Sequence, residues 1–269
     1  MRRGLFVTFE GPEGSGKSTQ IVTAKEKITS YLSSLFVASN PSFLKTHMDA
    51  YFSQKIVVFR EPGGAPEAEK LRKEVLSLNL TPREQCDYFL KGRSINVEKI
   101  IGPGLEKGHI VLCDRFDLST YVYQSRKTRE EDYLTTSEIQ AKHIPVFRAH
   151  DPLNPAYPDA TVIILVDPQK GLDCEREKNV FSDKGLGFHI HVASSMGNPE
   201  YVKSVLGAKR DVIFIDRRGL HFEREKAEVA GEIFSSLEKL LLSYYARNEK
   251  DFLKEITKSP NLNDLAREV

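Results

Sequence analysis

A glycine-rich segment near the start of the chain carries the first residues that could do chemistry. It reads Gly-Pro-Glu-Gly-Ser-Gly-Lys-Ser over residues 11–18 and follows the apolar run 5–9. The glycines allow consecutive backbone N–H groups to point at one polyphosphate, and a following helix adds the positive end of its dipole. The spacing fits the phosphate-binding loop pattern G-x-x-x-x-G-K-S/T. The residues predicted to bind a nucleoside triphosphate are Gly11, Glu13, Gly14, Ser15, Gly16, Lys17, Ser18 and Thr19.

Charged residues recur at the ends of two later strand-like runs. Arg60 opens the sequence Arg-Glu-Pro-Gly-Gly directly after the run 55–59, and Asp114-Arg115-Phe116 follows the run 109–113. The carboxyl ends of parallel strands meet at one edge of a sheet, where such folds bind their ligands. Each motif alone is a weak signal, and an Asp-Arg pair is more often a surface ion pair. Together with the glycine-rich loop, they predict one phosphate-binding site.

The side chains of these motifs suit the transfer of a phosphoryl group. Ser18 and Asp114 offer the hydroxyl and carboxylate oxygens that hold Mg²⁺ in phosphate-loop enzymes. Lys17 can neutralise charge on the transferring group. Arg115 can bridge two phosphate groups, because its planar guanidinium binds phosphate oxygens bidentately. We therefore expect Mg²⁺ as the cofactor and Lys17 and Arg115 as catalytic residues.

Five apolar runs and the helical patterns between them would position these residues. The runs lack polar alternation, which is typical of strands buried on both faces of a parallel sheet. Helical spacing is found at 17–35, 71–78, 89–105 and 229–244. This alternation predicts an α/β fold, with three α/β/α layers and a five-stranded parallel sheet of the P-loop NTPase type. The predicted strands are 5–9, 55–59, 109–113, 160–166 and 211–215.

The 269 residues fit one large α/β domain, and we expect a single P-loop kinase domain over 1–269. Two segments are additions to the plan of alternating strands and helices: a polar, aromatic-dotted insertion at about 36–54 and a C-terminal extension at about 249–269. A long connection, 124–159, contains four prolines. Connections of this length are usually functional or mobile.

Composition excludes several classes of partner. The net charge is +1, from 39 basic and 38 acidic residues, so we expect neither nucleic acid nor an anionic membrane as a partner. Three widely spaced cysteines, Cys86, Cys113 and Cys174, suit a reducing cytosol. The apolar run after Met1 is too short for a signal peptide or a membrane span. We therefore expect a soluble, cytoplasmic protein.

The order of the motifs resembles the thymidylate kinase family. That family carries the loop F-E-G-x-E/D-G-x-G-K-S/T, a strand-end R-E-P-G-G, a helical F-x-x-x-R, and D-R-Y/F leading to S-S/T-x-x-Y-Q. This chain matches them at 9–19, 60–64, 89–93, 114–116 and 119–124. The resemblance extends from about residue 5 to 242 and is interrupted by the insertion. It implies transfer of the ATP γ-phosphate to dTMP, and a homodimer.

The resemblance also implies roles for the acceptor-binding residues. Glu13 would meet the 3′-hydroxyl of the deoxyribose, and Arg60 and Arg115 would hold the acceptor phosphate. Tyr123 would lie beside the sugar, where the 2′-hydroxyl of a ribose would project. Phe89 would stack on thymine. The remaining substrate-binding residues implied are Arg93 and Thr120, which would read the edge of the base, and Gln124.

The loop also points to a mobile lid. Members with glycine after the loop acid, as at Gly14, resemble the type that supplies a catalytic cation from a lid, here expected at about 176–187. Arg176 matches a basic position of the family and is the third expected catalytic residue. The usual D-R-x-E signature is absent, and 183–186 reads Asp-Lys-Gly-Leu. Lys178 and Lys184 are the alternative lid cations.

Two other functions are open at this point. One is a related nucleotide or nucleoside kinase with a different acceptor, although the set Phe89, Arg93, Thr120 and Tyr123 favours thymine. The other is a non-catalytic nucleotide-binding protein that uses its insertion and its C-terminal extension for interactions. The missing lid signature motivates the second alternative, whereas the intact Lys17 opposes it.

Overall fold

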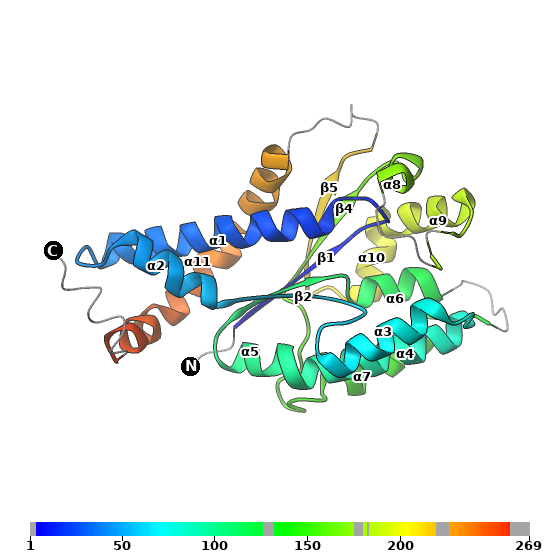
Figure 1. Cartoon of the computed structure of the whole chain (residues 1–269), viewed down its shortest axis with the longest axis horizontal. Helices are drawn as coiled ribbons and strands as arrows, with labels where there is room; N and C mark the ends of the chain where they lie inside the picture. Colours follow the sequence, from blue (N-terminus) through cyan, green and yellow to red (C-terminus); the bar gives the residue numbers. More distant parts are fainter. Residues whose placement is uncertain (1–3, 126–131, 175–179, 182, 219–225, 259–269) are drawn as a thin grey trace.

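The computed structural model describes residues 4–125, 132–174, 180–181, 183–218 and 226–258. At its centre lies a five-stranded sheet with strand order β2-β3-β1-β4-β5, in which every neighbouring pair is parallel (Figure 1). The strand prediction is confirmed to within one residue at each end. The strands are β1 (Leu5–Glu10), β2 (Ile56–Arg60), β3 (Ile110–Asp114), β4 (Ala160–Leu165) and β5 (Asp211–Asp216).

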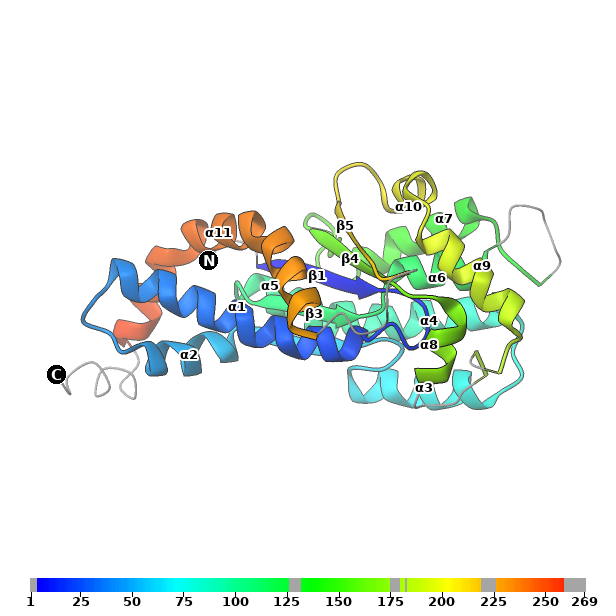
Figure 2. The same ribbon diagram turned by 90° about the horizontal axis from the view of Figure 1, so that it is seen from above.

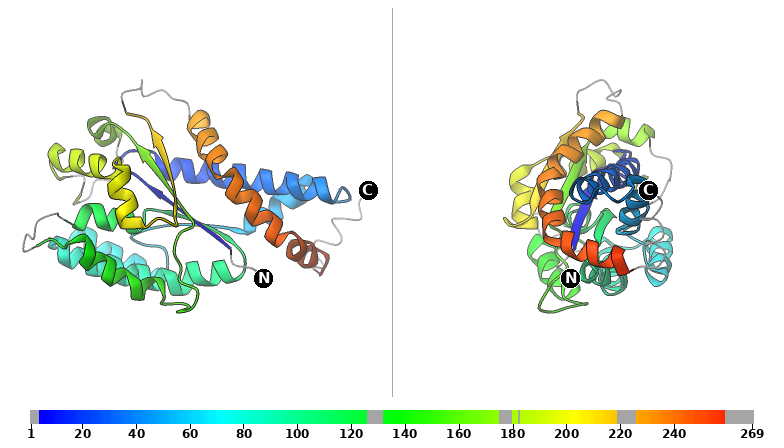
Figure 3. Two further views of the ribbon diagram at one scale, coloured as in Figure 1. Left: turned by 180° about the vertical axis from the view of Figure 1, so that it is seen from behind. Right: turned by 90° about the vertical axis from the view of Figure 1, so that its left-hand side faces the viewer.

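One face of the sheet is covered by helices α1 (Lys17–Ser39), α2 (Lys45–Gln54) and α11 (Lys226–Lys258). Side chains alternate between the two faces of a strand, so Leu5 and Val7 of β1 point the same way. Both are 1% exposed and belong to the apolar cluster that contains residues of these three helices. Helix α11 packs against α1, as Figure 3 shows from two sides.

The other face is covered by helices of the middle of the chain. Phe6 of β1 and Val111 of β3 point to this face, and Ile163 of β4 faces a second apolar cluster there. The sheet therefore lies between two helical layers, which confirms the predicted fold class. The remaining helices are α3 (Pro66–Ser77), α4 (Pro82–Asn96), α5 (Gly102–Glu106), α6 (Asp117–Gln124), α7 (Thr136–Phe147), α8 (Pro168–Cys174), α9 (Leu186–Met196) and α10 (Pro199–Leu206).

The helix predicted over 89–105 ends within one residue of the expected position, but its start and its interior differ from the prediction. It begins earlier, at Pro82, because Thr81 and Glu84 form a capping box in which each side chain bonds the other's backbone N–H. It is then interrupted by a π-helical turn, η1 (Val97–Ile101), before α5. The long connection 124–159 contains a helix of its own, α7, which starts with a second capping box at Thr135.

The insertion and the C-terminal extension pack against each other. Helix α1 runs through the start of the insertion, α2 forms most of the rest, and α11 continues without a break to Lys258. The rings of Phe52 and Phe252 meet edge to face, with their centroids 5.3 Å apart. Tyr51 donates a 2.8 Å hydrogen bond to Glu255, which also pairs with Lys55.

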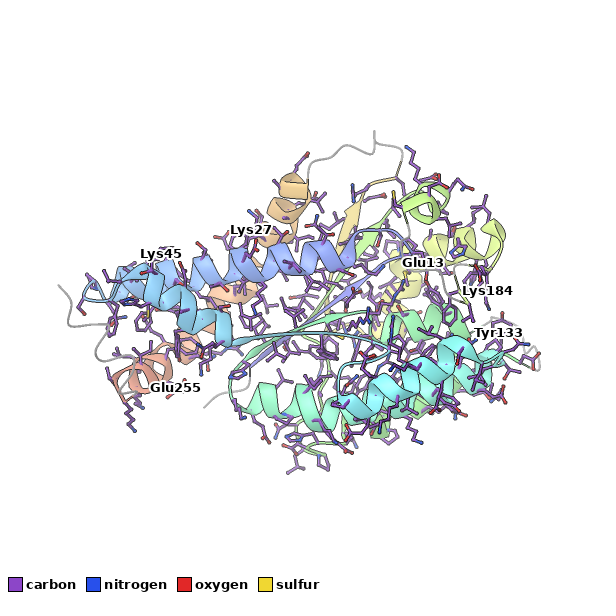
Figure 4. The ribbon with its side chains drawn as sticks, in the orientation of Figure 1. Glu13, Lys27, Lys45, Tyr133, Lys184 and Glu255 are labelled. Atoms are coloured by element: carbon purple, nitrogen blue, oxygen red, sulfur yellow. The ribbon has the colours of Figure 1, made fainter. Side chains whose placement is uncertain are left out.

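This packed unit lies away from the carboxyl ends of the strands. Figure 2 shows α2 and the end of α11 at the opposite end of the molecule from the loop after β1. Figure 4 places Glu255 and Lys45 at that far end, and Glu13 and Lys184 at the end that holds the loop. Within the described residues, no helix has the length and apolar character that crossing a bilayer needs.

Phe252→Ala should destabilise the protein without changing substrate affinity. The ring is fully buried and touches the rings of Tyr51, Phe52, Tyr244 and Tyr245, so its loss should cost about 3–5 kcal/mol of unfolding free energy. Denaturant unfolding measures this, and steady-state assays should return unchanged KM values. Lys254→Ala, in which a 70%-exposed neighbour is truncated, is the matched control. Equal stability of the two variants would contradict the assigned packing.

Candidate active site

A cavity of about 670 Å³ opens at the carboxyl ends of β1, β2 and β3. Its walls come from the glycine-rich loop, the strand-end motifs and the facing sides of α4 and α6. Gly11 and Ser15 belong to the loop but do not line the cavity. The predicted site residues that line it are Glu13, Gly14, Gly16, Lys17, Ser18, Thr19, Arg60, Phe89, Arg93, Asp114, Arg115, Thr120, Tyr123 and Gln124.

Lys17 lies folded over its own loop. Its Nζ donates to the carbonyl oxygens of Pro12 (2.7 Å) and Gly11 (3.1 Å) and to the Ser15 hydroxyl (3.2 Å). Burial, together with the positive charge of Arg115, lowers the pKa of Lys17 to about 8. The amine is therefore mainly protonated at neutral pH, but it loses its proton at a pH about two units lower than a solvated lysine does. Gly16, with φ 85°, provides the left-handed residue from which α1 starts.

Ser18 and Asp114 meet at the next position along the edge of the sheet. The Ser18 hydroxyl donates a 2.6 Å hydrogen bond to Asp114 Oδ2, because β1 and β3 are neighbours and Phe9 pairs with Asp114. Asp114 Oδ1 is buried and makes no hydrogen bond within the described residues. A hydroxyl and a carboxylate with an unsatisfied oxygen are hard ligands of the kind that Mg²⁺ prefers. The donor set fits the predicted metal.

Arg115 lies in a left-handed turn that is held by a buried carboxylate. Its φ of 63° is unusual for a residue with a side chain. Glu10, at the end of β1, accepts hydrogen bonds from the backbone N–H of Phe116 (2.9 Å) and from the N–H and hydroxyl of Ser119 (3.3 and 2.6 Å). Burial raises the pKa of Glu10. These bonds fix the turn between β3 and α6.

The turn directs the Arg115 guanidinium back onto the glycine-rich loop. It donates to the Gly11 carbonyl oxygen (3.2 Å), the Ser119 hydroxyl (3.3 Å) and Glu13 Oε1 (3.1 Å). It also lies over the ring of Tyr123, 5.5 Å from the centroid. The Tyr123 hydroxyl donates a 2.6 Å hydrogen bond to the second oxygen of Glu13. Motifs from two strands are therefore joined around one carboxylate.

Glu13 is an ionised group although it is only 6% exposed. Burial alone would raise the pKa of Glu13, but the charge of Arg115, the adjacent His189 imidazole, the charge of Lys17 and a hydrogen bond from Tyr123 outweigh it. The net result is a pKa held well below the usual value for glutamate. Glu13 can therefore act only as a hydrogen-bond acceptor at neutral pH.

Arg93 is fixed by contacts with four neighbouring side chains. It pairs with Glu61 (2.7 Å), donates to the Thr120 hydroxyl (3.1 Å) and lies over the ring of Phe116. It also lies 2.6 Å from His143 Nε2. Burial and the nearby charge of Arg93 lower the pKa of His143 to about 3, so the imidazole is neutral and Nε2 accepts. Sequence reasoning assigned no role to Glu61 or His143.

Among the lid residues that the structure describes, Phe181 lines the apolar wall of the cavity. The ring of Phe181 lies 6.2 Å from the ring of Phe89 and 5.5 Å from the ring of Tyr123. Gln124 donates to Gln85 (3.3 Å), and its carbonyl oxygen has no partner within the described residues. Arg60 is exposed at the end of β2 and lines the cavity rim.

Gly14 lies against the backbone of α8. A Cβ at Gly14 would come within 1.8 Å of the Gly171 carbonyl oxygen, and a Cβ at Gly171 would come within 2.4 Å of the Glu13 carbonyl oxygen. Gly14 also has a φ of 65°, where a side chain adds strain. The glycine after the loop acid is therefore required by this close approach of two backbones.

The predicted lid is described only in part. Arg176 and Lys178 lie outside the described residues, so the choice of Arg176 as the lid cation stays a prediction. Lys184 Nζ lies 4.7 Å from the ring centroid of Phe188 and 5.8 Å from that of Phe181.

Sequence reasoning also missed two arginines that line the cavity, Arg72 and Arg217. Arg217 directly follows β5, so its signal was the same strand-end position that marked Arg60. Arg72 lies in α3, where it donates a 2.9 Å hydrogen bond to the Pro62 carbonyl oxygen, and its local sequence carried no comparable signal. Glu10 and Glu61 lay inside recognised motifs, but their bonds connect distant segments.

Comparison with known proteins agrees with this geometry. The sequence profile of the family described as thymidylate kinase matches residues 42–192. The thymidylate kinase of Halalkalibacterium halodurans is 31% identical over 202 residues, which cover 71% of this chain and 80% of that protein. The thymidylate kinase of Wolbachia pipientis subsp. Culex pipiens is 30% identical over 185 residues, which cover 69% of this chain and 76% of that protein.

A solved structure supports the fold. The crystal structure of thymidylate kinase from Ehrlichia chaffeensis superimposes with a TM-score of 0.57 at 24% identity, over 88% of this chain and 99% of that one. A profile that matches more than half of the chain, with relatives of 30% identity or more that are covered over most of their length, establishes common ancestry. This chain therefore belongs to the thymidylate kinase family.

Proposed function

We propose that this protein transfers the γ-phosphate of ATP to dTMP, giving ADP and dTDP, in the synthesis of thymidine nucleotides. The observation that carries the proposal is the convergence of Lys17, the Ser18–Asp114 pair and Arg115 on one cavity whose other wall holds Phe89. One end of the cavity suits polyphosphate, and the other suits a nucleobase.

The donor triphosphate lies along the glycine-rich loop in this proposal. Backbone N–H groups of the loop and the start of α1 face its phosphates, and Lys17 exchanges its loop carbonyls for phosphate oxygens. Ser18 and Asp114 would hold Mg²⁺, which neutralises charge on the β- and γ-phosphates when bound.

The acceptor phosphate approaches between Arg60 and Arg115. An oxygen of dTMP forms a bond to the γ-phosphorus while the bond from that phosphorus to the β-phosphate oxygen breaks, and the electron pair leaves with ADP. No general base is needed, because the acceptor phosphate is already ionised. Arg115 bridges the two anions, since its turn places it between the loop and α6. Arg176 is proposed as a further cation from the lid.

The nucleoside of dTMP fills the other end of the cavity. Phe89 stacks on thymine, Arg93 and Thr120 face its edge, and Gln124 lies nearby. Glu13 accepts a hydrogen bond from the 3′-hydroxyl. Tyr123, held between Glu13 and Arg115, occupies the space beside the second carbon of the sugar.

We also propose the wider setting that the family resemblance suggests. The chain is a single P-loop kinase domain over 1–269 and forms a homodimer. The cysteine content suits the cytoplasm. The insertion and the extension support each other at the end remote from the cavity, so neither takes part in the chemistry.

The pH dependence of kcat/KM for ATP should report Lys17. The protonated amine is the competent form, so kcat/KM should fall as the pH rises through about 8, the pKa to which burial lowers it. A pH–rate profile measures this. Lys17→Arg keeps its charge throughout the range, so its residual activity should lose the falling limb. If kcat/KM of the variant still falls at the same pH, the fall is caused by the titration of another group.

A panel of acceptors tests the proposed function. ADP release should be fastest with dTMP, slower with dUMP, and at least about a hundredfold slower with dCMP and dAMP. The reason is that a base whose polar edge does not match the site leaves buried hydrogen-bonding groups of the protein unpaired. Lys17→Ala, which lacks the phosphate-binding cation, should release no ADP and serves as the control for contaminating kinases. Comparable rates with dAMP would favour a kinase of different specificity. No release with any acceptor would favour a non-catalytic nucleotide-binding protein.

A further inference from the structure

His189 is a buried titratable residue that the mechanism above does not use. It lies in α9, directly after the predicted lid, and is 1% exposed. Its Nδ1 lies 3.5 Å from Glu13 Oε2, at the outer limit of a hydrogen bond. Neither ring nitrogen has a hydrogen-bond partner within the described residues. The ring does not line the cavity, so it stands behind Glu13 rather than beside a substrate.

The chemistry of the contact fixes its direction. Glu13 is ionised, and a carboxylate can only accept, so the proton must be on Nδ1. Arg115 occupies Oε1 of Glu13, and the Tyr123 hydroxyl occupies Oε2. Since each carboxylate oxygen accepts two hydrogen bonds, one position on Oε2 remains for the imidazole. A buried polar group without a partner is unfavourable, so a hydrogen bond across this 3.5 Å gap stabilises the arrangement.

The same stretch of loop contacts the helices on both sides of the lid. Gly14 packs on the backbone of α8 through Gly171, and Glu13 meets α9 through His189. Helix α9 is itself held on the sheet by Val192 and Met196, both fully buried. The imidazole is therefore presented to Glu13 from a rigid support.

We propose that His189 is a positioning residue for the acceptor nucleotide. It donates a hydrogen bond from Nδ1 to Glu13 Oε2, and this bond orients the carboxylate toward the 3′-hydroxyl of the sugar. The proposal deepens the proposed function and rests on it, because it takes Glu13 to be the group that receives the 3′-hydroxyl. Its consequence is that the helix after the lid contributes to recognition of the sugar.

The test compares dTMP with its 3′-deoxy analogue, 2′,3′-dideoxythymidine monophosphate. The measured quantity is the ratio of kcat/KM for the two acceptors, at saturating ATP. His189→Phe keeps the ring volume but removes the donor, and the ratio should fall by roughly tenfold, the value of one hydrogen bond to a charged group. His189→Asn, whose amide can place a donor near the position of Nδ1, should keep the ratio within about threefold of the parent.

His191→Phe is the matched control, since it makes the same substitution at an exposed position of the same helix. It should leave the ratio unchanged. If His189→Phe lowers kcat/KM equally for both acceptors, the ratio stays constant, His189 is only a packing residue, and the proposal is overturned. If His189→Phe fails to fold, His189→Gln takes its place, because the Gln amide places its donor near Nε2 rather than Nδ1. The proposal would then be overturned if the Gln and Asn variants had the same ratio of kcat/KM for the two acceptors.

Glu13→Gln separates this proposal from the function on which it rests. If the Glu13→Gln variant has the parent ratio, Glu13 does not receive the 3′-hydroxyl, and the sugar assignment itself is wrong. If Glu13→Gln lowers the ratio but His189→Phe does not, the sugar assignment holds and the role of His189 is refuted. A fall in both, with both control variants intact, is the result that we expect.

Discussion

The left-handed turn at Arg115 is the constraint on which the rest of the site depends. Two polyanions must meet in the cavity, so a cation has to be fixed between them before they arrive. Glu10 fixes it from below, through bonds to Phe116 and Ser119, and Glu13 meets it from the loop. The strain of one positive φ is thus balanced by buried hydrogen bonds, and the guanidinium needs little reorganisation for the reaction.

The two ends of the molecule have different roles. At one end, aromatic rings of α2 and α11 form a closed apolar unit with no group that the reaction needs. At the other end, the loop after β1 packs closely on the backbone of α8 and contacts α9. Arg93, the most firmly fixed group of the acceptor site, is held by neutral His143 and by Glu61, so its orientation does not depend on the lid.

The strands and the phosphate-binding loop could be predicted from the sequence, whereas the contacts between residues far apart in the chain could not. Glycine spacing and the apolar runs are properties of neighbouring residues, so the strands and the phosphate loop were located to within a residue. The bond between Arg93 and His143 joins residues 50 positions apart, and that between Phe116 and Glu10 joins residues 106 apart. Likewise, the reason for glycine at 14 is the backbone of Gly171, which no local pattern indicates.

The single-turnover rate of Arg115→Ala, at saturating ATP and dTMP, tests the central claim most directly. If Arg115 bridges donor and acceptor in the transition state, phosphoryl transfer should slow by about a hundredfold or more, since a charged, preorganised contact of this kind contributes on the order of 3 kcal/mol. The KM for ATP should change little, because Lys17 and the loop still bind it. A parent-like transfer rate with only a raised KM for ATP would contradict the account.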